Sequence, residues 1–471
     1  MSDFQCEIGL IGLGTMGENF LLNMADHGYA VAGYNRTKDK VDHLIAEAGD
    51  RAIRGAKTVE ELIGMLKRPR RIVLLVPAGG PVDSVIGQLL PLLEEGDIII
   101  DGGNSHFTDT ERREKELAEK NIHFIGMGVS GGAEGARFGP SMMPGGKEDA
   151  YNEVKEIFEA ASAKVNGDPC ITYLGPRSAG HYVKMVHNGI EYGIMQLLSE
   201  CYDLMKNGLG LTNPELHQVF NEWNQAELSG FLVEITAEIF TQKDDKGDGW
   251  LIDKILDTAK QKGTGKWTSE DAFNLGVPIP SIDIAVTGRY LSALKMERKT
   301  AAEILSHPAV EFNGNKEEAI SQLRNSLYTA MIITYAQGMT LLQAASAEYD
   351  YNLDLESVAR IWRGGCIIRS VLLEDFRKAY RARPDLPNLL LDPHLAAAVK
   401  EREQDLRMTV KRTVGLGIPA PGFAVALGYL DSYRRQRLPA NLIQAQRDYF
   451  GSHTYQRIDM DGIFHTEWGK E

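Results

Sequence analysis

One stretch of the sequence, residues 180–192, carries five chemically versatile side chains at helical spacing. If this stretch is a helix, an amine, an imidazole, an amide, a carboxylate and a phenol fall on one stripe, roughly 12 Å long at about 1.5 Å of rise per residue. These residues are Lys184, His187, Asn188, Glu191 and Tyr192. One interpretation is a solvated helix face, because most charged stripes on helices are exposed to water. The other is a catalytic face on which Lys184 and Glu191 act as acid and base.

The N-terminal residues place a glycine-rich turn between a predicted strand and a predicted helix. The apolar run 7–11 leads directly into the turn, and an amphipathic helix follows. In this context Gly12 makes a tight turn, Gly14 lets the backbone approach a pyrophosphate, and Gly17 lets the helix pack closely on the strand. The free N–H groups of the helix N-terminus favour phosphate. We therefore expect a dinucleotide site, in preference to a turn that binds nothing. The residues expected to contact the cofactor here are Gly12, Leu13, Gly14, Thr15, Met16 and Gly17.

The residues after the second predicted strand bear on the choice of cofactor. An NAD-binding domain usually has an acidic residue here, which binds the ribose 2′-hydroxyl. This chain has Asn35, Arg36 and Thr37 instead. An amide, a guanidinium and a hydroxyl suit a 2′-phosphate through charge-assisted hydrogen bonds. We infer NADP rather than NAD, against the alternative that Arg36 is simply an exposed side chain.

Apolar strands alternate with helices over the first part of the chain. Continuous apolar runs such as 71–76 and 97–101 are typical of a parallel sheet that helices cover on both faces. Ligands of such sheets lie beyond the carboxyl ends of the strands. The loops 76–79, 101–105 and 128–132 follow three strands, and each could be only a turn, but together they predict a crevice. On its cofactor side we expect Val76, Pro77, Ala78 and Asn104, and Asn104 and Ser130 are suited to orient a polyhydroxylated substrate.

A change in periodicity predicts the domain organisation. A helix at 149–163 and a strand at 170–174 complete the alternating part, and helical periodicity takes over from residue 179. The clearest helices are expected at 192–205, 215–223, 228–240, 253–260, 282–295, 319–346 and 355–362. Residues 261–268 read as a flexible, cationic, glycine-rich loop suited to an anion, or as a mere helix connector. We predict a Rossmann-like dinucleotide-binding domain (1–178), an all-helical domain (179–437) and an extended C-terminal tail (438–471).

Composition excludes several classes of function. The 471 residues carry a formal net charge of −14, which disfavours non-specific binding to nucleic acid. The four cysteines have no CxxC spacing, which argues against a zinc site and for reduced thiols in a cytoplasmic protein. No signal peptide and no apolar run of membrane-spanning length occurs.

The tail contains Phe450, Phe464 and Trp468 but is too short to build its own core. It must therefore dock on another surface or remain loose, and the aromatic residues favour docking.

Several separate motifs make the sequence resemble the long-chain, decarboxylating 6-phosphogluconate dehydrogenases from about residue 7 to residue 468. The motifs are IGLGTMGxN, the Asn-Arg-Thr turn, IIIDGGNS, GVSGGxEGA, GHYVKMVHNGIEY, KGTGKWT and QAQRDYFGSHTY. Two positions depart from the family's usual residues. Gly14 stands in the middle of a loop that commonly reads GLAVMG, and Pro77 stands where many members have a lysine.

The resemblance implies oxidation of 6-phospho-D-gluconate to ribulose 5-phosphate and CO2, with NADPH formed and no metal required. Lys184 would then be the general base that takes the C3 hydroxyl proton, and Glu191 the acid that protonates C1 of the enediol. The implied substrate contacts are Asn104, Ser130, Gly131, Gly132, His187, Asn188, Tyr192, Lys262 and Arg289. Arg447 and His453 would complete the phosphate site from the other subunit of a homodimer.

Two other hypotheses remain open from the sequence. A β-hydroxyacid dehydrogenase of the 3-hydroxyisobutyrate type would share the glycine loop and the lysine, but it would not need the cationic set of Lys262, Arg289, Arg447 and His453. A catalytically silent NADP-binding or scaffold protein would not need an intact pair of Lys184 and Glu191.

Overall fold

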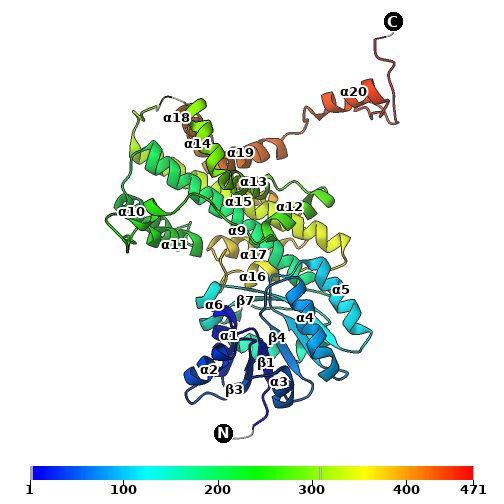
Figure 1. The fold of residues 1–471 in the computed structure, drawn as a ribbon. Helices are drawn as coiled ribbons and strands as arrows, with labels where there is room; N and C mark the ends of the chain where they lie inside the picture. Colours follow the sequence, from blue (N-terminus) through cyan, green and yellow to red (C-terminus); the bar gives the residue numbers. More distant parts are fainter. Residues whose placement is uncertain (1–3, 307, 309, 470–471) are drawn as a thin grey trace.

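The N-terminal part of the chain is a seven-stranded sheet with helices on both faces. The computed structural model describes residues 4–306, 308 and 310–469 (Figure 1). The strand order is β3-β2-β1-β4-β5-β6-β7, and all neighbours are parallel except β6 and β7. The strands are β1 (Ile8–Ile11), β2 (Val31–Tyr34), β3 (Ile53–Ala56), β4 (Arg71–Leu74), β5 (Ile98–Asp101), β6 (His123–Ser130) and β7 (Ser141–Gly146). The predicted Rossmann-like fold is confirmed.

Two apolar cores lie on the two faces of this sheet. One core joins α1 and α8 through residues such as Phe20 and Phe158, and the other joins α3, α4 and α5 through residues such as Leu62 and Leu117. The helices are α1 (Thr15–Asp26), α2 (Lys38–Glu47), α3 (Val59–Met65), α4 (Gly80–Leu89), α5 (Phe107–Ala118), α6 (Gly132–Phe138), α7 (Glu148–Asn152) and α8 (Lys155–Ala161). A short 3₁₀ turn, Leu90–Leu92, follows α4. Burial on both sides explains why the central strands are continuous apolar runs.

The predicted strand at 170–174 is wrong. The chain instead forms a small antiparallel hairpin of β8 (Lys164–Val165) and β9 (Asp168–Pro169), and Ile171 makes only one bridge, to Met142. The two residues between the strands, Asn166 and Gly167, both have positive φ, of 54° and 85°. An Asn-Gly pair in this conformation forms a tight two-residue turn, so the chain folds back before the apolar run begins.

The second part of the chain is built around two long helices, α9 (Ala179–Asp203) and α15 (Lys316–Glu348), which pack against each other. Helix α18 (Pro393–Leu416) packs along α15 and extends the core. The other helices are α10 (Asn213–Asn224), α11 (Phe231–Ile239), α12 (Thr264–Asn274), α13 (Pro280–Ala293), α14 (Lys295–Ile304), α16 (Leu355–Ile361), α17 (Leu372–Ala382), α19 (Pro421–Tyr433) and α20 (Ala440–Gly451). One π-helical turn (Leu204–Gly208) and two 3₁₀ turns (Leu251–Lys254 and Leu389–Leu391) connect them. The large helical part predicted from residue 179 onward is confirmed, and no helix of the described residues is long and apolar enough to cross a membrane.

Two local predictions in this part are corrected. The predicted helix at 253–260 is absent beyond the 3₁₀ turn, and the irregular segment that follows is held by ion pairs of Asp257 with Lys295 and Arg298. The predicted loop at 261–268 ends at Gly263, whose φ of 107° starts α12 at Thr264. The cationic segment is therefore short and is anchored by a helix.

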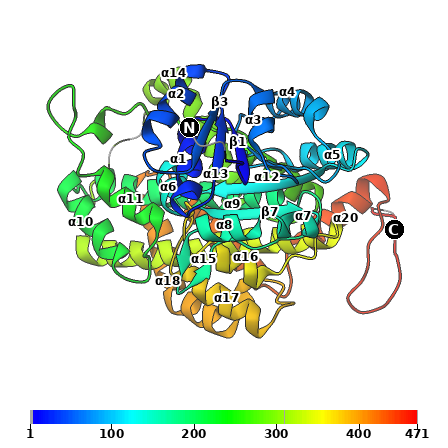
Figure 2. The same ribbon diagram turned by 90° about the horizontal axis from the view of Figure 1, so that it is seen from below.

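The C-terminal tail leaves the body of the molecule. Figure 1 shows α20 projecting away from the helical part, and Figure 2 shows the same segment lying to one side. After α20 the chain turns back, and Tyr455 and Phe464 pair in an antiparallel bridge. The tail is thus ordered within itself while several of its apolar side chains, including Leu442 and Phe450, stay exposed.

Candidate active site

A cavity of about 460 Å³ lies where the carboxyl ends of the strands meet the first helix of the second part. Its walls come from the glycine loop, the ends of β5 and β6, the middle of α9, the segment before α12, and α13. The lining residues are Met16, Asn104, Val129, Ser130, Gly131, Gly132, Lys184, Asn188, Glu191, Tyr192, Met195, Lys260, Gln261, Lys262, Thr264, Arg289 and Ile367. The location agrees with the rule that ligands of such sheets bind beyond the strand ends.

Close packing between α9 and the sheet places Lys184 in this cavity. A Cβ added to Gly180 would lie 2.3 Å from the carbonyl oxygen of Gly126, so only glycine lets the helix start against β6. One turn further along, a Cβ on Gly128 would lie 2.3 Å from the Cβ of Lys184. The lysine stem therefore runs directly over a bare stretch of strand, and its backbone position is set by two glycine contacts.

Lys184 is a buried amine without a close acidic partner. Its side chain is 5% exposed, and among the residues that the structure describes no carboxylate oxygen lies within 4.0 Å of its nitrogen. Burial lowers the pKa of Lys184, and the charge of Glu191 partly opposes that effect. A lysine whose pKa is lowered by burial can be neutral part of the time and can act as a base.

Glu191 lies two turns further along α9 and is half-buried in the same cavity. Burial raises the pKa of Glu191, while the charges of Lys184 and Arg289 oppose the shift. A carboxyl group with a raised pKa keeps its proton to a higher pH than an ordinary carboxyl group does. The two groups are thus shifted in the directions that an amine base and a carboxylic acid require.

A chain of hydrogen bonds crosses the floor of the cavity. The Asn188 amide nitrogen donates to Thr264 Oγ1 (3.1 Å), and the Asn188 carbonyl oxygen lies 3.0 Å from His187 Nδ1. Since that oxygen can only accept, Nδ1 carries the proton, and Nε2 accepts from the Ser130 hydroxyl at 3.3 Å. Burial and the charge of Lys184 lower the pKa of His187 well below its usual value. The imidazole is therefore neutral and has a fixed tautomer.

One end of the cavity is cationic. Lys260, Lys262 and Arg289 line it, and within the described residues none of them forms an ion pair shorter than 4.0 Å. The Arg289 guanidinium stacks over the Tyr192 ring at 3.6 Å from its centroid and donates to the Lys260 carbonyl oxygen at 3.0 Å. Cations without acidic partners at a cavity wall suit a multiply charged anion such as a phosphate.

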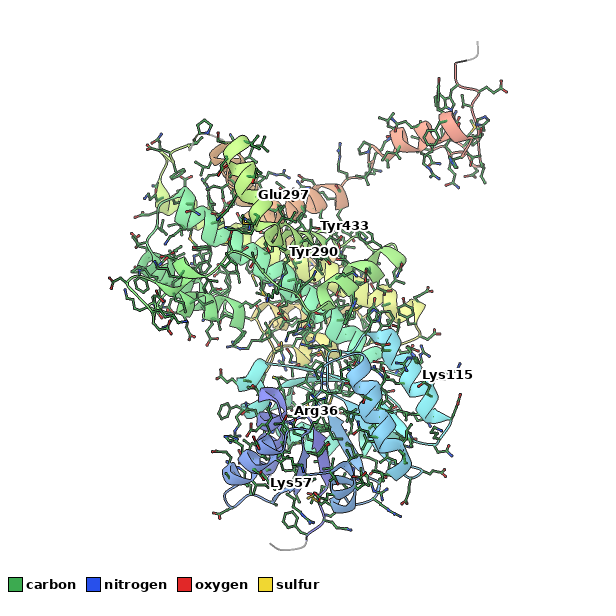
Figure 3. The ribbon with its side chains drawn as sticks, in the orientation of Figure 1. Arg36, Lys57, Lys115, Tyr290, Glu297 and Tyr433 are labelled. Carbon is green, nitrogen blue, oxygen red and sulfur yellow. The ribbon has the colours of Figure 1, made fainter. Side chains whose placement is uncertain are left out.

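The glycine loop has the geometry of a dinucleotide cradle. Gly12 has a φ of 107°, and a Cβ there would lie 2.4 Å from the Leu75 carbonyl oxygen. Gly14 has no neighbour within 4 Å of its Cβ position, which leaves its face open to a ligand at the N-terminus of α1. The Leu13 N–H donates to the Asn35 side-chain oxygen at 3.0 Å, so Asn35 also shapes the loop. Arg36 is exposed after β2, on the side of the sheet nearer the helical part (Figure 3).

Comparison with known proteins accounts for this arrangement. A family model described as the NAD binding domain of 6-phosphogluconate dehydrogenase matches residues 7–175, and one described as the 6-phosphogluconate dehydrogenase C-terminal domain matches residues 180–468. The chain belongs to the 6-phosphogluconate dehydrogenase family. The resemblance inferred from the sequence motifs is thereby confirmed.

Relatives in this family match over almost their whole length. The decarboxylating 6-phosphogluconate dehydrogenase of Lactococcus lactis is 52% identical over 469 residues, which is 99% of each chain. The NADP(+)-dependent, decarboxylating enzyme of Bacillus subtilis is 53% identical over 465 residues, 98% of this chain and 99% of that one. The solved Plasmodium falciparum 6-phosphogluconate dehydrogenase, described in its apo form and in complexes with its cofactor NADP+ and its substrate 6-phosphogluconate, is 46% identical. It has a TM-score of 0.95 and covers 98% of this chain and 100% of its own.

The structure of this 6-phosphogluconate dehydrogenase family member brings most of the predicted substrate residues together. Every predicted substrate residue between positions 104 and 289 lines the cavity except His187. The His187 side chain lies directly behind Ser130 and Asn188. Arg447 and His453 do not reach the cavity of their own chain, because they belong to the projecting tail. Six residues that were not predicted individually also line it: Val129, Met195, Lys260, Gln261, Thr264 and Ile367. Val129, Gln261 and Thr264 belong to the predicted loops 128–132 and 261–268, and Lys260 directly precedes the second of these, whereas no motif points to Met195 or Ile367.

Arg113 is a further residue of the family fold that the sequence did not reveal. Its side chain is 1% exposed, and it donates to the Gly79 carbonyl oxygen (3.0 Å), to Asp83 (2.8 Å) and to the Ser105 hydroxyl (3.3 Å). It therefore ties the loop 76–79 to the loop that carries Asn104.

Proposed function

We propose that the chain catalyses the oxidative decarboxylation of 6-phospho-D-gluconate to D-ribulose 5-phosphate and CO2, with reduction of NADP to NADPH. The observation that carries the proposal is a buried lysine that has no close acidic partner among the described residues, in a cavity bounded by a dinucleotide cradle on one side and by three cations on another. Membership of the 6-phosphogluconate dehydrogenase family supports the same reaction.

Lys184 and Glu191 are the proposed catalytic pair. When bound, NADP supplies the acceptor for the hydride that leaves C3. Lys184 takes the C3 hydroxyl proton as its base, which is consistent with the direction of its pKa shift. The protonated Lys184 then donates to the new C3 keto oxygen while C1 leaves as CO2. Glu191 gives a proton to the former C2, which is C1 of the resulting enediol and becomes C1 of ribulose 5-phosphate. The raised pKa of Glu191 supports its role as the acid.

The proposed cofactor site extends from the glycine loop to the loops after β4 and β5. Arg36 is the proposed partner of the 2′-phosphate, since it is exposed and its guanidinium can form bidentate hydrogen bonds. The proposed cofactor contacts are Gly12, Leu13, Gly14, Thr15, Met16, Gly17, Asn35, Arg36, Thr37, Val76, Pro77, Ala78 and Asn104. The open face of Gly14 and the N-terminus of α1 support this assignment of the pyrophosphate.

The proposed substrate orientation follows from the charges of the cavity. The phosphate faces Lys262 and Arg289, and the hydroxylated chain lies along α9 toward Lys184. Ser130 Oγ donates to neutral His187 and accepts from the Ile367 N–H at 3.4 Å, which leaves one lone pair to accept from a substrate hydroxyl. The proposed substrate contacts are Asn104, Ser130, Gly131, Gly132, His187, Asn188, Tyr192, Lys262 and Arg289.

We further propose a cytoplasmic homodimer in which Arg447 and His453 of the partner subunit complete the phosphate site. The projecting tail and its exposed Leu442, Ile443 and Phe450 support docking on a second copy. The division proposed is 1–178 for cofactor binding, 179–437 for substrate binding and dimerisation, and 438–471 for the docking tail. Four buried, free cysteines support a reducing compartment.

The reaction is tested by incubating the purified protein with 6-phosphogluconate labelled with ¹³C at C1 and with either NADP or NAD. We expect NADPH and labelled CO2 in equal amounts, with NADP preferred over NAD. Turnover of 3-hydroxyisobutyrate without CO2 release, together with no activity on 6-phosphogluconate, would instead identify a β-hydroxyacid dehydrogenase of another specificity.

A further inference from the structure

The C-terminal tail is organised around one buried carboxylate, that of Asp448. This side chain is fully buried although it lies in the projecting segment. Its two oxygens accept hydrogen bonds from two backbone N–H groups, an indole and an imidazole. The donors are Thr454 N (2.9 Å), Thr466 N (3.1 Å), Trp468 Nε1 (2.8 Å) and His465 Nδ1 (2.9 Å). Every one of these partners belongs to the tail, so the carboxylate connects the end of α20 to the returning strand.

The residues next to this carboxylate adopt an unfavourable backbone conformation. Ser452 and Thr454 have φ values of 50° and 61°, and a β-branched residue rarely enters this left-handed region. Such a conformation persists only where surrounding contacts over-determine it. Here the Thr454 N–H donates to Asp448, and the Thr454 carbonyl oxygen accepts from Gln444 Nε2 at 2.6 Å. The turn is therefore held by hydrogen bonds at both the N–H group and the carbonyl oxygen of Thr454.

His453 lies between the two left-handed residues and is exposed. Its ring meets the Phe450 ring edge-on, with centroids 6.0 Å apart, and a Cβ on Gly451 would approach the imidazole to 2.7 Å. Arg447 is also exposed, and its Nη1 donates to Gln444 Oε1 at 3.0 Å. Gln444 thus contacts both the Arg447 side chain and the turn that carries His453. The two cationic or potentially cationic side chains are held in a common frame before any partner is bound.

We propose that Asp448 is a positioning residue, which pre-forms the tail so that Arg447 and His453 reach the anion end of the partner subunit's cavity in the correct arrangement. The proposal rests on the proposed function, in which the tail docks on the partner. A segment that is ordered before docking loses less conformational freedom when it binds, so more of its contact energy contributes to affinity. Loss of the frame weakens substrate binding and leaves the cofactor loop, which belongs to another part of the chain, unaffected.

The direct test compares Asp448→Asn with Asp459→Asn. In either orientation of the introduced amide, its NH2 group faces a backbone N–H donor, from Thr454 or from Thr466, so the frame loses at least one hydrogen bond. Asp459 is an exposed tail carboxylate paired with Arg457, and its substitution removes the same charge without touching the frame. We expect Asp448→Asn to raise the KM for 6-phosphogluconate tenfold or more while the KM for NADP stays unchanged. We expect Asp459→Asn to leave both constants unchanged.

Co-expression of differently tagged subunits separates positioning from general misfolding. A mixed dimer of Lys184→Ala and Asp448→Asn subunits has one cavity with an intact lysine and an intact partner tail. Because that lysine belongs to the Asp448→Asn subunit, activity requires this subunit to be folded. We expect about half of the wild-type activity per dimer, with a wild-type KM for 6-phosphogluconate. A reference dimer of Lys184→Ala and His453→Ala subunits should behave in the same way.

Each other outcome is decisive. An inactive reference dimer would overturn docking of the tail on the partner, which belongs to the proposed function. If the reference dimer is active but the Asp448→Asn homodimer has the wild-type KM for 6-phosphogluconate, the positioning role is overturned. An active reference dimer beside an inactive mixed dimer with Asp448→Asn would also overturn it, because Asp448 would then support the whole subunit.

Discussion

Replacement of Gly128 by alanine should displace the proposed catalytic base without removing it. The added Cβ would lie 2.3 Å from Lys184 Cβ and 2.6 Å from Lys184 Cγ, whereas ordinary contact begins at 3.4 Å. The lysine stem must therefore retreat by about 1.1 Å. Helix α9 cannot absorb the change at its start, because Gly180 is packed so closely there that a Cβ would lie 2.3 Å from the Gly126 carbonyl oxygen and 2.2 Å from that of Met143. A misplacement of about 1 Å in a reacting group costs up to ~10²-fold in rate, or about 2.7 kcal/mol of activation free energy.

The assay is NADPH formation at saturating 6-phosphogluconate and NADP, with cofactor affinity and thermal unfolding measured on the same samples. We expect kcat to fall about 10- to 100-fold and the affinity for NADP to stay unchanged. Gly87→Ala is the matched control, since its Cβ position on α4 has no neighbour within 4 Å and the site is exposed. A Gly128→Ala enzyme with a kcat within about twofold of the wild type would refute the reasoning that close packing on β6 positions Lys184.

Three further substitutions test separate parts of the account. Glu191→Gln removes a charge that raises the pKa of Lys184, so the low-pH limb of the kcat/KM profile should move to lower pH and kcat should fall. A low-pH limb that does not move would contradict the electrostatic coupling between Glu191 and Lys184. Arg36→Ala should raise the KM for NADP about tenfold or more and leave the KM for NAD unchanged, since only NADP carries the 2′-phosphate. Burial raises the pKa of Glu200 to about 7 from 4.5 in the unfolded chain, so the native state prefers the protonated form. The free energy of unfolding should therefore fall by on the order of 3 kcal/mol as pH rises through this range, and Glu200→Gln should flatten that dependence in urea titrations.

Local spacing was sufficient to place the proposed catalytic side chains on one face of a helix. Lys184, Asn188 and Glu191 lie within two turns of one another, so the helical period alone places them on one stripe, and the structure has all three at the cavity. The glycine loop was predictable for the same reason, because a Cβ at Gly17 would meet the carbonyl oxygen of Gly12 in the same turn and because Gly12 itself has a positive φ, although the close approach of Gly12 to Leu75 after β4 is a contact that the sequence does not show. Features that depend on neighbours in the sequence can be inferred from the sequence.

Features that depend on distant segments could not be predicted in this way. Arg113 connects two loops that lie eight and more than thirty residues from it, and nothing in its own surroundings marks it. The segment near Asp257 has helical spacing, but Lys295 and Arg298, about forty residues away, bind Asp257 in an irregular stretch of chain. Ile367 enters the cavity from a loop beyond α16. In each case tertiary contacts decide the outcome, and local preference does not.

The tail shows a different limit of sequence reasoning. Its aromatic residues indicated docking, but the hydrogen bonds that organise it converge on Asp448 from residues up to twenty positions away. A lone carboxylate beside an arginine carries no pattern that would single it out. Its importance follows only from the folded path of the chain.

The measurement that tests the central claim most directly compares wild type with Lys184→Ala. NADP binding is measured by fluorescence titration, and NADPH formation and CO2 release are measured with labelled 6-phosphogluconate. Lys378→Ala, which removes an exposed lysine paired with Asp375 on α17, serves as the control. The account predicts that Lys184→Ala binds NADP normally and loses both hydride transfer and decarboxylation, while the control keeps both. Near-normal turnover by Lys184→Ala would contradict the assignment of Lys184 as the base.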